Sequence, residues 1–77
     1  MFDDAGAIAE YMSARYSISE WDVGDSAAIG RSGELVLTVY YRADTRDWRL
    51  WVRRGANVTT HRVRTAAQLD AIMASVG

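Results

Sequence analysis

The residues that could carry out catalysis or bind a metal are few and scattered in this 77-residue chain. His61 is the only histidine. It falls at a core-facing position opposite Leu50, so we expect it to be structural. Cysteine is absent, which excludes disulfides and thiolate ligands and argues against a transition-metal site. No Ser–His–acid set can be assembled, because the serines lie in turns or at element ends outside any nucleophile motif. The sequence therefore predicts no enzyme active site, no metal and no cofactor.

Two other ligand-binding patterns are missing as well. Asp22, Asp25 and Asp44 do not follow the spacing of a calcium-binding loop. Residues 24–33 (GDSAAIGRSG) contain glycines but lack the Lys-Ser/Thr of a phosphate-binding loop, so we predict a turn-rich loop there. The sequence leaves open whether residues 27–29 pair with a strand.

Arginine is the one chemically distinctive residue that the chain supplies in number. All nine basic residues are Arg, and with ten acidic residues the net charge is −1. Guanidinium groups bind carboxylates and phosphates through paired hydrogen bonds and also stack on aromatic rings. Residues 48–77 carry five Arg and a single acid, whereas residues 1–47 carry nine acids and four Arg. We expect an electrostatically polar molecule unless the two halves interleave and neutralise each other.

The composition is that of a globular protein, with 49% hydrophobic and 25% charged residues, and the length suits a single domain over residues 1–77. No apolar run approaches the roughly 20 residues that a membrane helix needs. The chain starts with Met1, Phe2, Asp3 and Asp4, which is acidic where a signal peptide would be basic. We therefore expect a cytoplasmic location and no membrane partner.

Two helices are expected, one near each end of the chain. Asp3 or Asp4 can cap the first, whose apolar stripe recurs at helical spacing: Ala5, Ile8, Ala9, Met12 and Tyr16. Thr65 and Gln68 form the capping box of the second, and Gly77 is suited to end it. Its apolar stripe consists of Ala66, Leu69, Ile72, Met73 and Val76.

Strands are expected between the helices, at residues 34–42, 48–54 and 57–64, because these segments are β-branched, aromatic or alternating. Residues 18–23 are expected to form a fourth strand with a bulge, since the apolar parity shifts between Ile18 and Trp21. The predicted fold is α+β: a helix, a three- to four-stranded antiparallel meander and a closing helix, with both helices on one sheet face.

Loop lengths suggest a register for this sheet. A four-residue loop at 44–47 places Tyr41 opposite Leu50, Tyr40 opposite Trp51 and Arg42 opposite Arg49. A type II′ turn at Gly55 and Ala56 places Arg49 opposite Arg62, Trp51 opposite Thr60 and Leu50 opposite His61. The helices should then cover Leu35, Leu37, Val39, Tyr41, Trp48, Leu50, Val52 and Val63.

The uncovered face is the candidate partner-binding surface. It should carry the six site residues Tyr40, Arg42, Arg49, Trp51, Arg53 and Arg62. Like charges directly opposite each other are destabilising, so the Arg row needs compensation. Either Glu20, Asp22, Asp44 or Asp47 neutralises it, or an anionic partner does. A homodimer that buries Tyr40 and Trp51 is a further alternative.

In general character, the strand WRLWVRR followed by the capped helix TAAQLDAIM in so small a chain resembles the accessory proteins of phages and mobile elements, among them anti-CRISPR proteins. That resemblance implies a non-enzymatic inhibitor that docks on a host nucleoprotein, such as a defence complex, and blocks nucleic-acid binding or nuclease recruitment. A nucleic-acid-binding module using the same face is the alternative function, and a homodimerising structural protein is the second.

Overall fold

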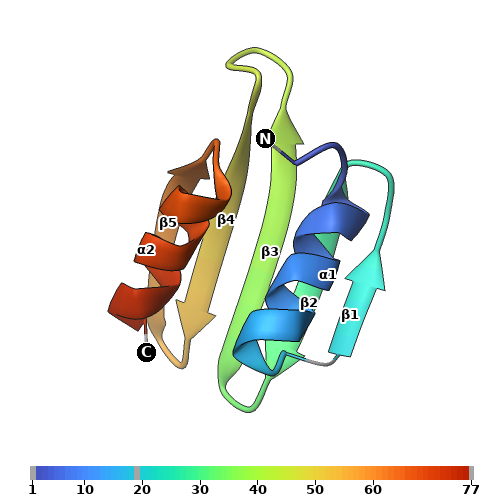
Figure 1. Cartoon of the computed structure of the whole chain (residues 1–77). Coiled ribbons are helices and arrows are strands. Elements are labelled where there is room, and N and C mark those ends of the chain that lie inside the picture. The colour runs from blue at the N-terminus through green and yellow to red at the C-terminus, as the bar shows by residue number, and fades with distance from the viewer. Residues whose placement is uncertain (1, 19, 77) are drawn as a thin grey trace.

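The computed structural model describes residues 2–18 and 20–76, which form two helices on one face of an antiparallel sheet (Figure 1). The sheet has five strands in the order β1-β2-β3-β4-β5, so that each strand lies beside its neighbours in the chain. The elements are α1 (Ala5–Tyr16), β1 (Glu20–Val23), β2 (Ala27–Ser32), β3 (Leu35–Arg42), β4 (Asp47–Arg54), β5 (Asn57–Val63) and α2 (Ala66–Val76). The predicted α+β class, element order and placement of both helices are confirmed.

Both helices begin at the predicted caps. Asp4 accepts a 2.8 Å hydrogen bond from the backbone N–H of Ala7 at the start of α1. At the start of α2, the Thr65 hydroxyl accepts from the N–H of Gln68 at 3.2 Å. The Gln68 side chain accepts at 2.6 Å from the N–H of Arg64 rather than that of Thr65, so the capping box is displaced by one residue. Gly77 lies outside the described residues.

The core lies between the helices and the inner sheet face. Helix α1 contributes Ile8 and Met12, and α2 contributes Leu69 and Met73. The sheet contributes the predicted inward-facing residues at its centre, which are almost fully buried: Leu37, Val39, Trp48, Leu50, Val52 and Val63. Leu35 and Tyr41 are the exceptions, because they lie near the two ends of β3: Leu35 is half-buried and Tyr41 remains 36% exposed.

The sheet contains one strand more than predicted. The segment 24–33 was expected to be a turn-rich loop, but Ala27–Ser32 forms β2 between β1 and β3. This strand is hard to predict because it contains Gly30, and glycine is uncommon in strands. Glycine is required at this position because it lies opposite Trp21, whose ring would be 2.7 Å from a Cβ added to residue 30. The pairing from Glu20 to Val23 is regular. The bulge predicted between Ile18 and Trp21 falls in part on residue 19, which lies outside the described residues.

The register between β3 and β4 differs from the predicted one by two residues. Tyr41 lies opposite Trp48, Tyr40 opposite Arg49 and Arg42 opposite Asp47. The loop is residues 43–46 because Asp47 belongs to the strand, where its carboxylate meets the arginines beside it. A shift of two residues preserves the side-chain alternation, so the predicted faces hold although the pairs are wrong.

The register between β4 and β5 is as predicted. Arg49 pairs with Arg62, Leu50 with His61 and Trp51 with Thr60. The turn between the strands depends on Gly55, whose φ of 58° is what a type II′ turn requires at its first central position.

Neither helix of the described chain has the length and apolar character needed to cross a lipid bilayer.

Candidate interaction face of the sheet

The sheet face opposite the helices, which we call the outer face, is not covered by any other element of residues 2–18 and 20–76 (Figure 1). Side chains at its centre are half-buried. They come from β2, β3 and β4 and are mainly aliphatic and aromatic: Ile29, Val36, Thr38, Tyr40, Arg49 and Trp51. The face therefore offers apolar surface that a partner could bury.

Asp47 organises the arginines at one end of this face. Its side chain is fully buried at 0% exposure. Oδ1 accepts hydrogen bonds from the Thr45 hydroxyl at 2.8 Å and from Arg49 Nε at 3.1 Å. Arg62 Nε lies 2.9 Å from Oδ2, and Arg64 Nε lies 3.9 Å from it. Oδ2 has no well-aligned hydrogen bond, so charge attraction alone holds it among these cations.

These contacts determine the protonation state of Asp47. Burial alone raises the pKa of a carboxyl group. Here the hydrogen bonds from Thr45 and Arg49, with the charges of Arg49 and Arg62, outweigh that burial and lower the pKa of Asp47 below its usual value. Asp47 is thus a carboxylate at neutral pH, and it offsets the repulsion between the paired Arg49 and Arg62.

Arg42 and Arg53 have different surroundings. Arg42 makes a two-pronged contact with Asp44, from Nε at 3.1 Å and from Nη2 at 2.7 Å, and this pairing lowers the pKa of Asp44. Arg53 is exposed and donates from Nε to the backbone carbonyl of Gly55 at 3.2 Å. No ion pair between described residues involves Arg53, so its charge is available to a partner.

All six predicted site residues lie on the outer face, but they are grouped differently from the prediction. Tyr40 and Trp51 are not directly opposite, because Tyr40 faces Arg49 and Trp51 faces Thr38 and Thr60. Arg42 faces Asp47 rather than Arg49. The predicted triple row of arginines is therefore reduced to the Arg49–Arg62 pair, with Tyr40 beside it.

Acidic side chains of the chain itself neutralise the arginines in part. This was one of the two alternatives drawn from the sequence. Asp44 and Asp47 supply it, whereas Asp22 lies 3.4 Å from Arg31 near the other edge of the sheet. Four arginines surround these two carboxylates, which leaves an excess of two positive charges at this end of the face: Arg42, Arg49, Arg62 and Arg64. The surface stays cationic despite its internal pairing.

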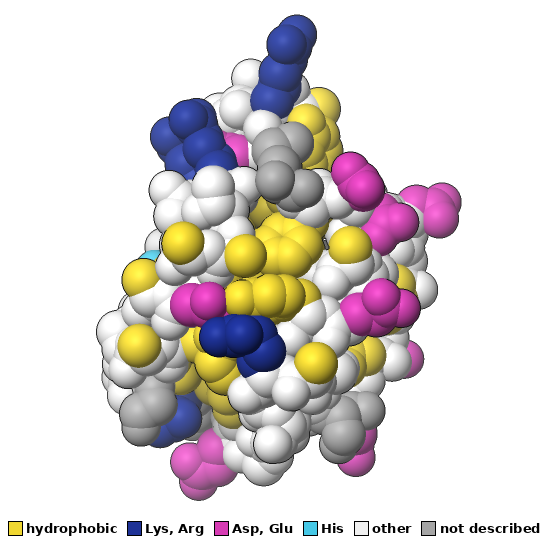
Figure 2. Space-filling view, viewed as in Figure 1, with side chains coloured by type: hydrophobic (Ala, Val, Ile, Leu, Met, Phe, Trp, Pro, Cys, Tyr) yellow, Lys and Arg dark blue, Asp and Glu magenta, His cyan; other side chains and the backbone are white. Residues whose placement is uncertain are grey.

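The helical side of the molecule has the opposite character. Figure 2 shows acidic side chains spread over the α1 side, and basic side chains where the β3–β4 hairpin projects, at the centre of the view and at its lower left. Asp3, Asp4 and Glu10 are exposed there. The charge asymmetry expected from the sequence thus becomes a difference between an acidic helical side and a cationic region of the outer face.

The sequence predicts Asp47 in a loop, and its position at the centre of the arginine cluster is not predicted. A carboxylate immediately before an Arg-rich strand was the available signal. His61 is partly exposed, and its Nε2 lies 2.9 Å from the Thr59 hydroxyl. Within the described ranges, no group of three or more His, Cys, Asp or Glu side chains is placed to hold a metal ion.

In comparisons with known proteins, no family model, curated protein or solved structure matches the chain.

Proposed function

We propose that the protein is a non-enzymatic interaction protein whose outer face binds an anionic surface of a protein or nucleoprotein partner. The observation that carries this proposal is the uncovered, half-buried apolar strip of Tyr40 and Trp51, bordered by an excess of arginine. Tyr, Trp and Arg are the residues that most often dominate binding at protein interfaces.

The charge of the face favours one mode of inhibition for the anti-CRISPR type of protein. A nucleic-acid channel is itself basic and would repel the arginines of the outer face. An acidic docking surface on a host nucleoprotein would attract them. We therefore favour an inhibitor that blocks the recruitment of a nuclease or another subunit over one that fills the nucleic-acid channel.

The test uses substitutions that spare the buried ion pairs. Trp51→Ala with Arg53→Glu removes the central aromatic ring and reverses the charge of an arginine without an acidic partner. Arg54→Glu is the matched control, because Arg54 is an equally exposed neighbour on β4 whose side chain alternates to the other face. Arg49 is left intact because Asp47 requires it.

The wild type and the R54E variant should retain a host partner captured under native conditions, and the W51A/R53E variant should lose it. With the partner purified, we expect affinity to fall by at least about 30-fold in the double variant, since an interfacial Trp contributes about 2 kcal/mol or more. A partner that binds the folded double variant as tightly as the wild type would rule out the outer face.

The same variants distinguish the two alternative functions. A nucleic-acid-binding module should bind single-stranded oligonucleotides at low salt, and its affinity should fall steeply as salt rises. A homodimer should show twice the monomer mass in solution and become monomeric in W51A. Either result would replace the proposal with the corresponding alternative.

A further inference from the structure

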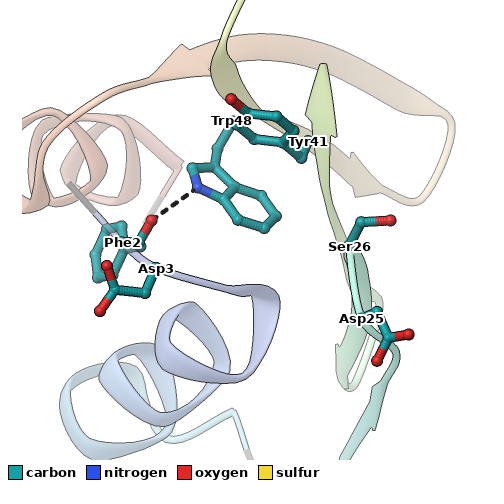
Figure 3. A pocket seen from close by; sticks show the side chains of 6 residues that line it. All are labelled: Phe2, Asp3, Asp25, Ser26, Tyr41 and Trp48. Atoms are coloured by element: carbon teal, nitrogen blue, oxygen red, sulfur yellow. Dashed lines mark hydrogen bonds between the residues drawn. The ribbon is translucent and has the colours of Figure 1, made fainter. Parts of the chain in front are cut away.

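A cavity of about 280 Å³ lies on the inner side of the sheet, where Tyr41 and Trp48 line it beside the N-terminal segment. Trp48 Nε1 donates to the backbone carbonyl of Phe2 at 3.2 Å, which Figure 3 shows as a dashed line. Asp3 and Asp25 also line the cavity, but their carboxylates point away from the aromatic rings (Figure 3). The cavity therefore has no charged group, among the residues described, that would select a ligand, and a free edge of the sheet is the better-defined binding surface.

The two edges of the sheet differ in how far they are protected from pairing with another strand. An edge strand presents unpaired backbone N–H and C=O groups, and proteins usually protect it by shortness, charge, proline or a bulge. Strand β1 is protected in this way, because it has four residues and carries two exposed acids, Glu20 and Asp22. Strand β5 has seven residues, contains no proline and pairs with β4 without a bulge from Asn57 to Val63. The edge of β5 is therefore open to a further strand.

Nothing in the described chain covers the edge of β5, which lies at the margin of the sheet (Figure 1). Residues 57–60 are all exposed, and Val58 is 49% exposed although it is apolar. Arg62 is the one Asp, Glu, Lys or Arg residue of the strand, and its Nε lies 2.9 Å from Asp47 on the β4 side. The edge thus lacks the charges that would repel another strand.

The hairpin register determines which backbone groups of β5 point outward. Arg54 and Asn57 close a two-residue turn, so they form a hydrogen-bonded pair. Bonded and non-bonded pairs alternate along an antiparallel ladder, so every second residue from Asn57 onward directs its N–H and C=O to β4. The 3.0 Å hydrogen bond from the Tyr41 N–H to the Ser26 carbonyl gives the same alternation when it is followed across the sheet. The residues between direct their N–H and C=O to the free edge: Val58, Thr60 and Arg62.

We propose that this edge pairs with the same edge of a second copy of the chain, in an antiparallel register centred on Thr60. Strand β5 is self-complementary in this register. Thr60 forms a hydrogen-bonded pair with its counterpart, Val58 forms one with Arg62, and all seven residues find a partner. Like charges are nowhere opposite. A centre at Arg62 would set two guanidinium groups opposite each other and leave most of the strand unpaired.

Helix α2 adds apolar surface beside this edge. Asp70 lies on the side of α2 that faces α1, because it accepts a hydrogen bond from the Tyr11 hydroxyl. Ile72 lies about 200° further round the helix, on the side away from α1 and toward the edge, and it is half-buried. Pairing of the edges places the two α2 helices alongside each other with Ile72 on their facing sides. The pair therefore buries apolar surface as well as backbone groups.

The pairing also enlarges the outer face of the sheet. Opposite residues of paired strands lie on the same face, so Arg62 of the second copy lies beside Val58 on the outer side. Each copy thus adds an arginine to the face of the other, and two five-stranded sheets become one continuous surface. The proposal does not depend on the proposed function, because the edge can pair whether or not the outer face binds a partner.

The test measures the mass of the full chain by sedimentation equilibrium at concentrations up to about 1 mM. We expect a reversible equilibrium between monomer and dimer. Amide hydrogen exchange in the same samples tests the register. The N–H groups of Val58, Thr60 and Arg62 should gain protection as the dimer forms, whereas those of Thr59 and His61 should be protected at every concentration.

Two exposed valines give a matched pair of variants, because Val58 on β5 and Val23 on β1 are 49% and 54% exposed. Val58→Lys places a cation opposite Arg62 of the second copy, twice in each dimer. It should weaken dimerisation by about two- to thirtyfold. Val23→Lys adds the same charge to the other edge and should leave the dimer unchanged.

Substitutions of Thr60 test the centre of the register. Thr60→Pro removes an N–H that points outward, which an edge strand tolerates, and should weaken dimerisation by at least about tenfold. Thr60→Arg and Thr60→Glu each set like charges opposite each other across the axis, so each variant alone should dimerise less than the wild type. An equimolar mixture of these two should restore dimers, because opposite charges then meet. This charge exchange remains decisive if the proline variant does not fold.

A monomeric mass at every concentration would overturn the proposal. A dimer that W51A dissociates and V58K does not would also overturn it, since the outer face would then be the interface. Growth into open-ended polymers that V23K suppresses would show instead that β5 pairs with β1 of the next copy. Equal dimerisation of the single Thr60 charge variants and their mixture would exclude the register centred on Thr60.

Discussion

The hydroxyl of Tyr11 in α1 donates a 2.8 Å hydrogen bond to Oδ2 of Asp70 in α2, across a separation of 59 residues. The hydroxyl of Tyr16 donates to Oδ1 of the same carboxylate, and Arg15 Nε lies 3.4 Å from it. The guanidinium carbon of Arg15 also lies 5.2 Å from the centre of the Tyr11 ring. We call this group the Asp70 clamp. It ties together two helices that otherwise meet only through the core.

The first prediction concerns loss of this clamp. Asp70→Asn should lower the free energy of unfolding, because the amide keeps the size of the carboxylate but removes its charge and one acceptor oxygen. Asp22→Asn is the control, since Asp22 makes only an exposed contact with Arg31. Urea denaturation of the two variants should show a larger loss for D70N. An equal effect in both would mean that the clamp does not stabilise the fold.

The clamp also predicts a dependence of stability on pH. Hydrogen bonds from Tyr16 and Tyr11 lower the pKa of Asp70 below its ordinary value of 3.8. The stability contributed by this shift is complete above the unfolded pKa and is lost as pH falls through the folded one. The wild type should therefore lose more stability than D70N when thermal unfolding is followed from neutral pH to below pH 3.8. Parallel pH profiles would contradict this.

Asp47→Asn tests the arginine cluster. The variant leaves Arg49 and Arg62 facing each other without a carboxylate, and it should be less stable than Asp44→Asn, which disturbs only an exposed pair. Because the loss is mainly charge repulsion, added salt should recover part of it in D47N. Thermal unfolding at low and high salt measures both effects. A salt-insensitive loss would point to packing instead.

Gly30→Ala tests the contact with Trp21. The added methyl group would lie 2.7 Å from the indole ring, so the ring or the strand must shift. Such overpacking costs about 1–3 kcal/mol. Trp21→Ala removes the obstacle, so Gly30→Ala should cost much less in that background. Additive effects in the double-mutant cycle would refute the steric explanation.

Arg46 tests the cost of a left-handed backbone conformation. It has a φ of 55° in the β3–β4 loop, a conformation that costs a non-glycine residue roughly 1–2 kcal/mol. Arg46→Gly should therefore be more stable than Arg46→Ala by about 1 kcal/mol. Both variants remove the same side chain, so the difference between their stabilities reports the cost of the backbone conformation at residue 46. Chemical denaturation gives the comparison, and equal stability would show that the loop relaxes without cost.

The sequence was sufficient for the elements whose signals are local. The helix at Ala5–Tyr16, the helix after Thr65 and the turn at Gly55 follow from capping, apolar spacing and glycine chemistry. The division of the sheet into inner and outer faces was also predictable, because alternation survives a register error of two residues.

The features that sequence could not supply depend on partners distant along the chain. Strand β2 was missed because Gly30 weakens the strand signal. The glycine is needed there because the ring of Trp21, on the neighbouring strand, leaves no room for a Cβ. The β3–β4 register was missed because the role of Asp47 depends on Arg62 and Arg64, which follow after the next turn of the chain. The cavity beside Tyr41 depends on the hydrogen bond from Trp48 Nε1 to the backbone carbonyl of Phe2, and no local sequence pattern predicts that contact.

The order of the strands also bears on how the chain folds. Each strand pairs with its immediate neighbour, so every hairpin closes over a short loop and the contact order of the sheet is low. Such topologies fold faster than sheets that pair distant segments. Helix α1 is made before β2 and β3, on which it packs. We expect the meander to form early, α1 and α2 to dock onto it, and the contacts across 59 residues to close last.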